Sequence, residues 1–183
     1  MSDTMKRDSK FISLVLRHEP EKFGVVLDEA GWTPVEGLLA ACARAGRVIP
    51  RQRLEEIVRT NDKQRFAFSG DGLRIRTNQG HSVPVELGHP EATPPEVLYH
   101  GTARQHVASI LREGLRPGAR HDVHLSERLD TASAVGRRHG ELVILTVRAG
   151  DMYRGGHVFR RTPNGVWLVP AVPPEFIKRA DGD

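Results

Sequence analysis

Cysteine and long apolar runs are nearly absent from this chain of 183 residues. The single cysteine, Cys42, cannot form an intrachain disulfide, which excludes a disulfide scaffold and a cysteine-rich zinc module. No apolar run approaches the roughly 18 residues of a membrane-spanning helix. The opening MSDTMKRDSK has no apolar stretch of the kind found in secretory signals. We therefore expect a cytoplasmic protein outside the membrane.

Lysine is also scarce, with five lysines against 22 arginines. A hydrophobic content of 38% is typical of a globular protein and too high for a disordered one. The planar guanidinium of arginine holds phosphate through two parallel hydrogen bonds, so the arginine excess favours a phosphate-bearing partner. A compositional bias of the genome would give the same count, and the net charge of +4 does not decide between them.

The chain divides at a proline-rich segment, GHPEATPP, that shows no apolar periodicity. We expect a first lobe over residues 1–88, a linker over 89–95 and a second lobe over 96–183. The length fits two small domains. Neither a heptad repeat nor an apolar run indicates a dimer, and a monomer is expected.

The first lobe is predicted to contain three helices followed by a β-hairpin. An apolar stripe over residues 11–16 predicts a helix ending near His18, before Pro20. Residues 33–36, Thr-Pro-Val-Glu, have the pattern of a capping box, and Pro50 opens a third helix. RFAFS and LRIRT alternate around Gly-Asp-Gly, which is typical of a hairpin. This order predicts a winged helix.

Residues 44–76 of that lobe contain nine basic and four acidic residues. Such a local excess is expected of a surface that follows nucleic-acid phosphates. A solvated helix face with a hairpin used only for packing would give the same pattern.

The second lobe is dominated by predicted strands: EVLYHGT, DVHLS, ELVILTVRA, HVFRRT and GVWLV. Residues 102–105 have a capping-box pattern that predicts a helix after the first strand. The apolar run ELVILTVRA is the expected central strand. The whole chain is therefore assigned to the α+β class.

Histidines concentrate in the second half of the chain, where His121 and His124 suggest a zinc site. These two do not share a strand face and have no thiol nearby, so we expect no metal. A P-loop, a nucleophile elbow and a GxGxxG after a strand are all missing. The lobe is therefore not an obvious kinase, hydrolase or Rossmann dehydrogenase.

Two strand ends in the second lobe carry polar groups that suit a ligand. His100-Gly101-Thr102 combines exposed backbone, a hydroxyl and a helix N-terminus, which suits an amide or phosphates. Alternation places His124 and Ser126 on one face of the next strand. Taken alone, a histidine on a strand is more often structural than ligand-binding.

Five motifs that follow one another in a fixed order favour a ligand-binding role for these histidines over a structural one. They are Ser13-Leu14-Val15-Leu16-Arg17-His18, Asn61-Asp62-Lys63-Gln64-Arg65-Phe66, His100-Gly101-Thr102, Arg120 before Val123-His124-Leu125-Ser126, and Asn164-Gly165-Val166-Trp167-Leu168. From about Ser9 to Ile177, the chain resembles the NAD-dependent RNA 2′-phosphotransferases (KptA-like), which complete fungal tRNA splicing and occur widely in bacteria.

The resemblance implies a winged-helix lobe followed by an ADP-ribosyltransferase-like, β-rich lobe that binds NAD. It also implies a reaction in two steps on an RNA with an internal 2′-phosphate. That phosphate first displaces nicotinamide from NAD, giving a 2′-phospho-ADP-ribosylated RNA. The ribose 2″-hydroxyl then attacks the phosphorus, and the products are RNA 2′-OH and ADP-ribose 1″,2″-cyclic phosphate.

The resemblance further implies the residues of the site. The family's catalytic tetrad falls on Arg17, His18, Arg65 and Arg120, with His18 as the expected general acid. The expected NAD-binding residues are His100, Gly101, Thr102, Ser109, His124 and Ser126. Without the resemblance, Arg17 and His18 would be read as cations that end a helix.

Two alternatives remain open. An ADP-ribosyltransferase acting on protein or nucleic acid commonly carries an acidic residue late in the fold. This chain has no acidic residue between Asp151 and Glu175, although relatives that modify terminal phosphates of nucleic acids stay possible. A winged-helix binder without catalysis would bind RNA and consume no NAD, and it would leave His100 and His124 unexplained.

Overall fold

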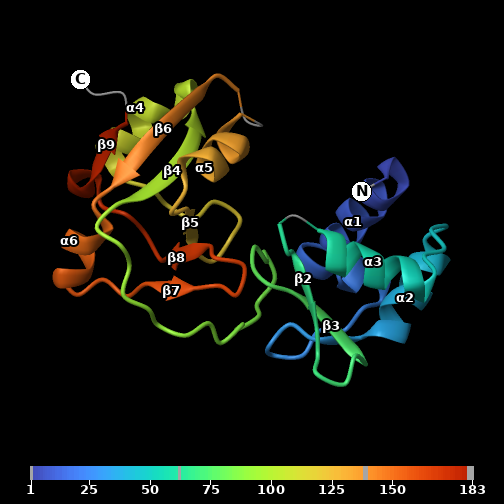
Figure 1. Cartoon of the computed structure of the whole chain (residues 1–183). Coiled ribbons are helices and arrows are strands. Elements are labelled where there is room, and N and C mark those ends of the chain that lie inside the picture. The colour runs from blue at the N-terminus through green and yellow to red at the C-terminus, as the bar shows by residue number, and fades with distance from the viewer. Residues whose placement is uncertain (1, 62, 138–139, 181–183) are drawn as a thin grey trace. The chain divides into compact units, whose positions relative to one another are not determined.

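The computed structural model describes residues 2–61, 63–137 and 140–180, and it divides into two compact units, Met1–Gly88 and His89–Asp183 (Figure 1). Both units combine helices with small antiparallel sheets, which confirms the α+β class. Over the ranges described, no helix has the length and apolar character needed to cross a membrane.

The first unit packs three helices against a three-stranded sheet of order β1-β3-β2. Its elements are α1 (Asp3–Arg17), η1 (Glu21–Phe23), β1 (Thr33–Pro34), α2 (Val35–Arg44), α3 (Arg51–Thr60), β2 (Phe66–Phe68) and β3 (Arg74–Thr77). The expected apolar stripe is the packed face of α1, since Ile12, Val15 and Leu16 are fully buried. The predicted hairpin is confirmed, with β2 and β3 antiparallel.

The predicted capping box at residues 33–36 is wrong. Thr33 and Pro34 form β1, which pairs with Ile75 and Arg74 of β3, and α2 begins at Val35 without a side-chain cap. Thr33 is buried. An N-cap residue also has an extended backbone, so the same sequence pattern suits a residue that pairs with a strand.

The second unit contains two three-stranded antiparallel sheets, of order β4-β6-β9 and β5-β8-β7. Its elements are β4 (Leu98–Ala103), α4 (Arg104–Glu113), β5 (Val123–Leu125), α5 (Leu129–Gly136), β6 (Leu142–Val147), α6 (Ala149–Arg154), β7 (Arg160–Arg161), β8 (Trp167–Val169), η2 (Pro174–Phe176) and β9 (Ile177–Arg179). The apolar run predicted as central is β6, in the middle of its sheet (Figure 1). Buried side chains of both sheets form one core.

The second predicted capping box, at residues 102–105, is also wrong. Thr102 and Ala103 belong to β4, and α4 begins at Arg104 without a side-chain cap. The Arg104 amide donates to Glu141 O at 2.8 Å, which continues the pairing of β4 with the segment before β6. Helix α4 therefore begins later in the sequence than predicted, after the residues of β4 that pair with this strand.

The segment expected as a linker makes contacts within the second unit. The Ala92 amide donates to Phe159 O at 2.9 Å, and the Arg161 amide donates to Pro90 O at 3.3 Å. Ala92 also packs against the core of this unit.

Candidate functional site

Arg17 and His18 lie at the end of α1, where the helix meets a loop from much later in the sequence. Arg17 is the last helical residue and His18 is the C-cap. The Arg17 carbonyl accepts a hydrogen bond from the Ser82 amide at 2.9 Å, and His18 Nδ1 lies 2.9 Å from Ser82 Oγ. Gly80, with φ +86°, lies against the guanidinium: a Cβ there would be 3.5 Å from Arg17 Nη1.

Arg65 precedes β2 and is held by a buried asparagine. Arg65 Nη1 donates to Asn61 Oδ1 at 3.3 Å, and Asn61 Nδ2 donates to Ser9 Oγ of α1 at 3.1 Å. The Asn78 amide donates to Arg65 O at 2.8 Å. The loop after β3 therefore begins beside Arg65 and reaches Arg17 and His18, and it links these three predicted residues within the first unit.

Several arginines of the basic stretch 44–76 are used inside the first unit. The buried carboxylate of Asp8 forms ion pairs with Arg47 at 3.1 Å and Arg53 at 3.3 Å. Arg51 pairs with Glu55 at 2.9 Å. Carboxylates of the same unit therefore offset part of the positive charge in the predicted RNA surface.

In the second unit, Gly101 lies in β4, an outer strand of its sheet, and it is buried, so the expectation of exposed backbone at Gly101 is wrong. Tyr99 exchanges both backbone hydrogen bonds with Ser126, at 2.8 and 2.9 Å. Bonding direction alternates along a strand, so the backbone groups of Gly101 point to the same edge, away from β6. The Tyr99–Ser126 bridge is an isolated one, so the ladder does not continue to Gly101 and His124, which would pair next.

The side chain of His100 makes a contact at the point where the backbone pairing of β4 with Ser126 ends. Its Nδ1 lies 3.2 Å from the carbonyl oxygen of His124. A carbonyl only accepts, so Nδ1 of His100 carries the proton. The contact brings His100 and His124 together, beside the backbone of Gly101.

Arg120 is joined to this arrangement through His124. Arg120 Nη1 lies 3.2 Å from His124 Nδ1. A guanidinium only donates, so His124 Nδ1 must accept, and the proton of the neutral ring is on Nε2. The two histidines thus hold opposite tautomers. Nearby atoms partly desolvate the Arg120 guanidinium and lower its pKa from the usual value, but the group keeps its charge at neutral pH.

Gly101 has a packing role as well. A Cβ at Gly101 would overlap the carbonyl oxygen of Ala132 in α5 and approach the Gly136 amide to 3.0 Å. Helix α5 can therefore lie directly on β4 only because position 101 lacks a side chain. The sequence motif alone did not reveal this reason for the glycine.

The other predicted ligand residues differ in their positions. Thr102 is buried in β4, on the same strand face as His100. Ser126 holds β5 to β4 through its backbone. Ser109 is exposed on α4, and its hydroxyl donates to His106 O at 2.9 Å within the helix. That bond does not connect Ser109 to His100 or His124.

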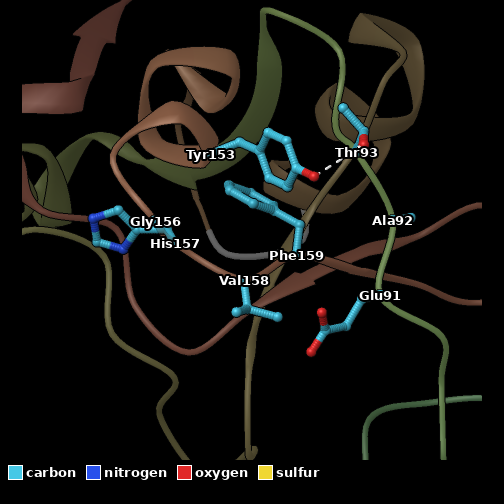
Figure 2. A pocket seen from close by; sticks show the side chains of 8 residues that line it. All are labelled: Glu91, Ala92, Thr93, Tyr153, Gly156, His157, Val158 and Phe159. Carbon is cyan, nitrogen blue, oxygen red and sulfur yellow. Dashed lines mark hydrogen bonds between the residues drawn. The ribbon is translucent and has the colours of Figure 1, made fainter.

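A hollow of about 320 Å³ lies elsewhere on the second unit, between the 91–93 segment and the end of α6 (Figure 2). Tyr153 closes one side, and its hydroxyl accepts a hydrogen bond from Thr93 Oγ1 at 3.3 Å (Figure 2). None of the predicted site residues lines this hollow. Among the residues with described positions, no group of three histidine, cysteine or acidic side chains could hold a metal ion.

Comparison with known proteins identifies the family. The model of the RNA 2′-phosphotransferase family, Tpt1 / KptA, matches residues 3–171. The chain belongs to this family. It is 52% identical over 178 residues to a probable RNA 2′-phosphotransferase of Pseudomonas paraeruginosa, covering 97% of this chain and 98% of that protein. This RNA 2′-phosphotransferase family member is therefore an enzyme of the transferase class.

Two further relatives carry the same description. A probable RNA 2′-phosphotransferase of Streptomyces griseus is 52% identical over 176 residues, covering 92% of this chain and 93% of its own. One from Herpetosiphon aurantiacus is 49% identical over 171 residues, covering 93% and 94%. The similarity thus extends through both units of the RNA 2′-phosphotransferase family member.

The sequence analysis missed Ser82 and singled out Asn61 only as part of a motif. Ser82 contacts His18 across 64 positions of sequence, and no local pattern marks such a pair. Asn61 could have been found as a helix-ending residue, since its Oδ1 also accepts from the Lys63 amide at 3.0 Å.

Proposed function

We propose that this protein removes an internal 2′-phosphate from RNA by transferring it to NAD. The observation that carries this proposal is the family match over residues 3–171. The contact between Arg120 and His124, close to where the pairing of β4 with Ser126 ends, supports it. We also propose that residues 1–88 are a winged-helix lobe and 96–183 an ADP-ribosyltransferase-like lobe, with 89–95 between them.

The second unit has groups that fit NAD. The carboxamide of nicotinamide carries a donor and an acceptor, and it matches the adjacent N–H and C=O of Gly101. The bonds at Nδ1 place the proton of a neutral His124 ring on Nε2 and make Nε2 of His100 the acceptor, so the two rings differ in hydrogen-bonding character. We assign Thr102, Ser109 and Ser126 to the same site by the resemblance.

In the first step, an oxygen of the RNA 2′-phosphate attacks C1″ of the nicotinamide ribose. The bond between C1″ and the pyridine nitrogen breaks, and its electron pair stays with neutral nicotinamide. This nucleophile is already an anion, so it requires positioning more than a base. The guanidinium groups of Arg17, Arg65 and Arg120 are suited to hold it through charge-assisted hydrogen bonds.

In the second step, the phosphorus is attacked by the ribose 2″-hydroxyl, which releases its proton to solvent. The bond from phosphorus to the RNA 2′-oxygen breaks, and that oxygen takes the electron pair. His18 supplies the proton that this oxygen needs, since an imidazole titrates near neutrality. The arginines stabilise the extra charge on phosphorus.

We further propose that the protein acts as a monomer in the cytoplasm and uses no metal. The single cysteine, Cys42, is fully buried and free, which fits a reducing compartment.

The test is an RNA oligonucleotide with one internal 2′-phosphate, incubated with and without NAD. We expect dephosphorylated RNA, nicotinamide and ADP-ribose 1″,2″-cyclic phosphate in equal amounts, only with NAD, and unchanged by a chelator. Nicotinamide release with ADP-ribose retained on RNA or protein would instead indicate an ADP-ribosyltransferase. RNA binding without NAD consumption would indicate a non-catalytic binder.

A further inference from the structure

At the C-terminal end of α1, one backbone carbonyl group accepts a hydrogen bond from a loop that lies much later in the sequence. The Leu14 carbonyl accepts from both the His18 amide at 3.0 Å and the Glu19 amide at 3.1 Å. The Arg17 carbonyl accepts instead from the Ser82 amide at 2.9 Å. The backbone of Ser82 is therefore fixed beside His18.

The loop that carries Ser82 is itself anchored. His81 is buried, and its Nε2 lies 2.8 Å from Thr77 Oγ1 at the end of β3. With the backbone held on both sides, Ser82 Oγ lies 2.9 Å from His18 Nδ1 and 3.4 Å from the Arg17 carbonyl oxygen. A serine hydroxyl has one proton and can also accept, so it can donate to Arg17 O while it accepts from His18 Nδ1.

We propose that Ser82 is a positioning residue that holds His18 Nδ1–H and thereby directs Nε2 to the proton transfer. The proposal rests on the proposed function, in which His18 is the acid of the second step. The acid form of His18 carries protons on both nitrogens, and Ser82 accepts the one at Nδ1. After Nε2 gives up its proton, the Nδ1–H bond to Ser82 remains, and the ring needs no rearrangement.

The first test measures the contact without any reaction. The ring nitrogens of His18 are observed by ¹⁵N NMR in the intact protein and assigned by their loss in His18→Asn. We expect Ser82→Ala to shift the His18 nitrogens and change the tautomer ratio, and Ser82→Thr to restore them. Ser133→Ala is the matched control, because it removes an exposed hydroxyl that donates only within α5, to Leu129 O.

The second test separates the two chemical steps. We expect Ser82→Ala to slow conversion of the phospho-ADP-ribosylated RNA about 3- to 10-fold, the effect of one ordinary hydrogen bond. Nicotinamide release and the KM for NAD should stay at the wild-type values, and Ser82→Thr should recover the rate. Circular dichroism and a thermal melt of each variant separate misfolding from loss of this contact.

Unchanged His18 nitrogens in a folded Ser82→Ala protein would overturn the proposal, and so would an equal slowing of both steps. The proposed function fails on a different result, namely a wild-type enzyme that forms no dephosphorylated RNA and no ADP-ribose 1″,2″-cyclic phosphate in the presence of NAD. The two failures are therefore distinguishable.

Discussion

Arg120 donates a hydrogen bond to Nδ1 of His124, over 3.2 Å. This contact connects a residue assigned to the phosphate with a residue assigned to NAD, within one unit. A protonated Nδ1 could not accept from a guanidinium, so the bond requires the Nε2–H tautomer of His124. His124 therefore affects the position of Arg120 as well as any ligand it contacts.

Substitution of His124 tests this relationship. Asparagine places an amide oxygen near the position of Nδ1 and can accept from Arg120, whereas alanine cannot. We expect His124→Ala to lower turnover about 10-fold or more, as for loss of a hydrogen bond to a charged group, and His124→Asn to retain more activity than alanine. Single-turnover rates at saturating NAD measure the difference. Equal losses in both variants would contradict a role in holding Arg120.

Arg65→Ala is expected to abolish turnover while the first unit stays folded. Arg65 precedes β2 and is half-buried, and its partner Asn61 keeps its bond to Ser9 without it. If Arg65 holds the 2′-phosphate, the loss removes a charge-assisted pair of roughly 1.5–3 kcal/mol or more. Arg7→Ala is the control, since it removes an equal charge from an exposed position on α1, outside the basic stretch 44–76. Wild-type rates for Arg65→Ala at saturating substrates would refute the assignment.

Gly101→Ala should destabilise the second unit, because the new methyl overlaps the carbonyl oxygen of Ala132. Overpacking of this kind costs typically about 1–3 kcal/mol. Gly118→Ala is the control, since a Cβ there has no atom within 4 Å. Thermal melts of both variants give the comparison. A Gly101→Ala protein as stable as Gly118→Ala would show that α5 shifts freely on β4.

Sequence patterns predicted the elements whose apolar periodicity is regular, such as α1, β6 and the β2–β3 hairpin. They failed at Thr33 and Thr102, where the signature of a helix cap also suits an extended residue that pairs with a strand. Contacts such as Ser82 to His18, or Arg120 to His124, depend on how loops fold back, and local sequence carries no information on them. Residue types could be predicted from motifs, but their hydrogen-bond partners could not.

Cys42 provides a pH-dependent test of the first unit. Burial, together with the nearby Asp8 carboxylate, raises the pKa of the Cys42 thiol to about 11, while Arg47 opposes this. The unfolded thiol ionises at about 8.5. Between these values the folded state binds more protons, so the free energy of unfolding falls as pH rises, by up to about 1.4 kcal/mol per pH unit.

Urea unfolding at pH 8, 9 and 10 measures this slope, with Cys42→Ala as the control that lacks the thiol. We also expect native Cys42 to react with iodoacetamide only as fast as the first unit opens, because its side chain has no exposed surface. Rapid labelling at pH 8 without denaturant would contradict both expectations.

His18→Ala should separate the two chemical steps. The first step needs an oriented phosphate and a departing nicotinamide, and neither requires an acid at His18. The second step needs a proton on the RNA 2′-oxygen, and loss of a general acid usually costs about 10²–10⁴ in rate. The 2′-phospho-ADP-ribosylated RNA should therefore accumulate and be visible on a denaturing gel. His18→Asn should bind the phosphate better than alanine, since its amide donates a hydrogen bond, yet it cannot deliver a proton. A His18→Ala enzyme that releases nicotinamide as slowly as it forms final product, with no intermediate at any time, would make His18 a residue that positions the phosphate in both steps.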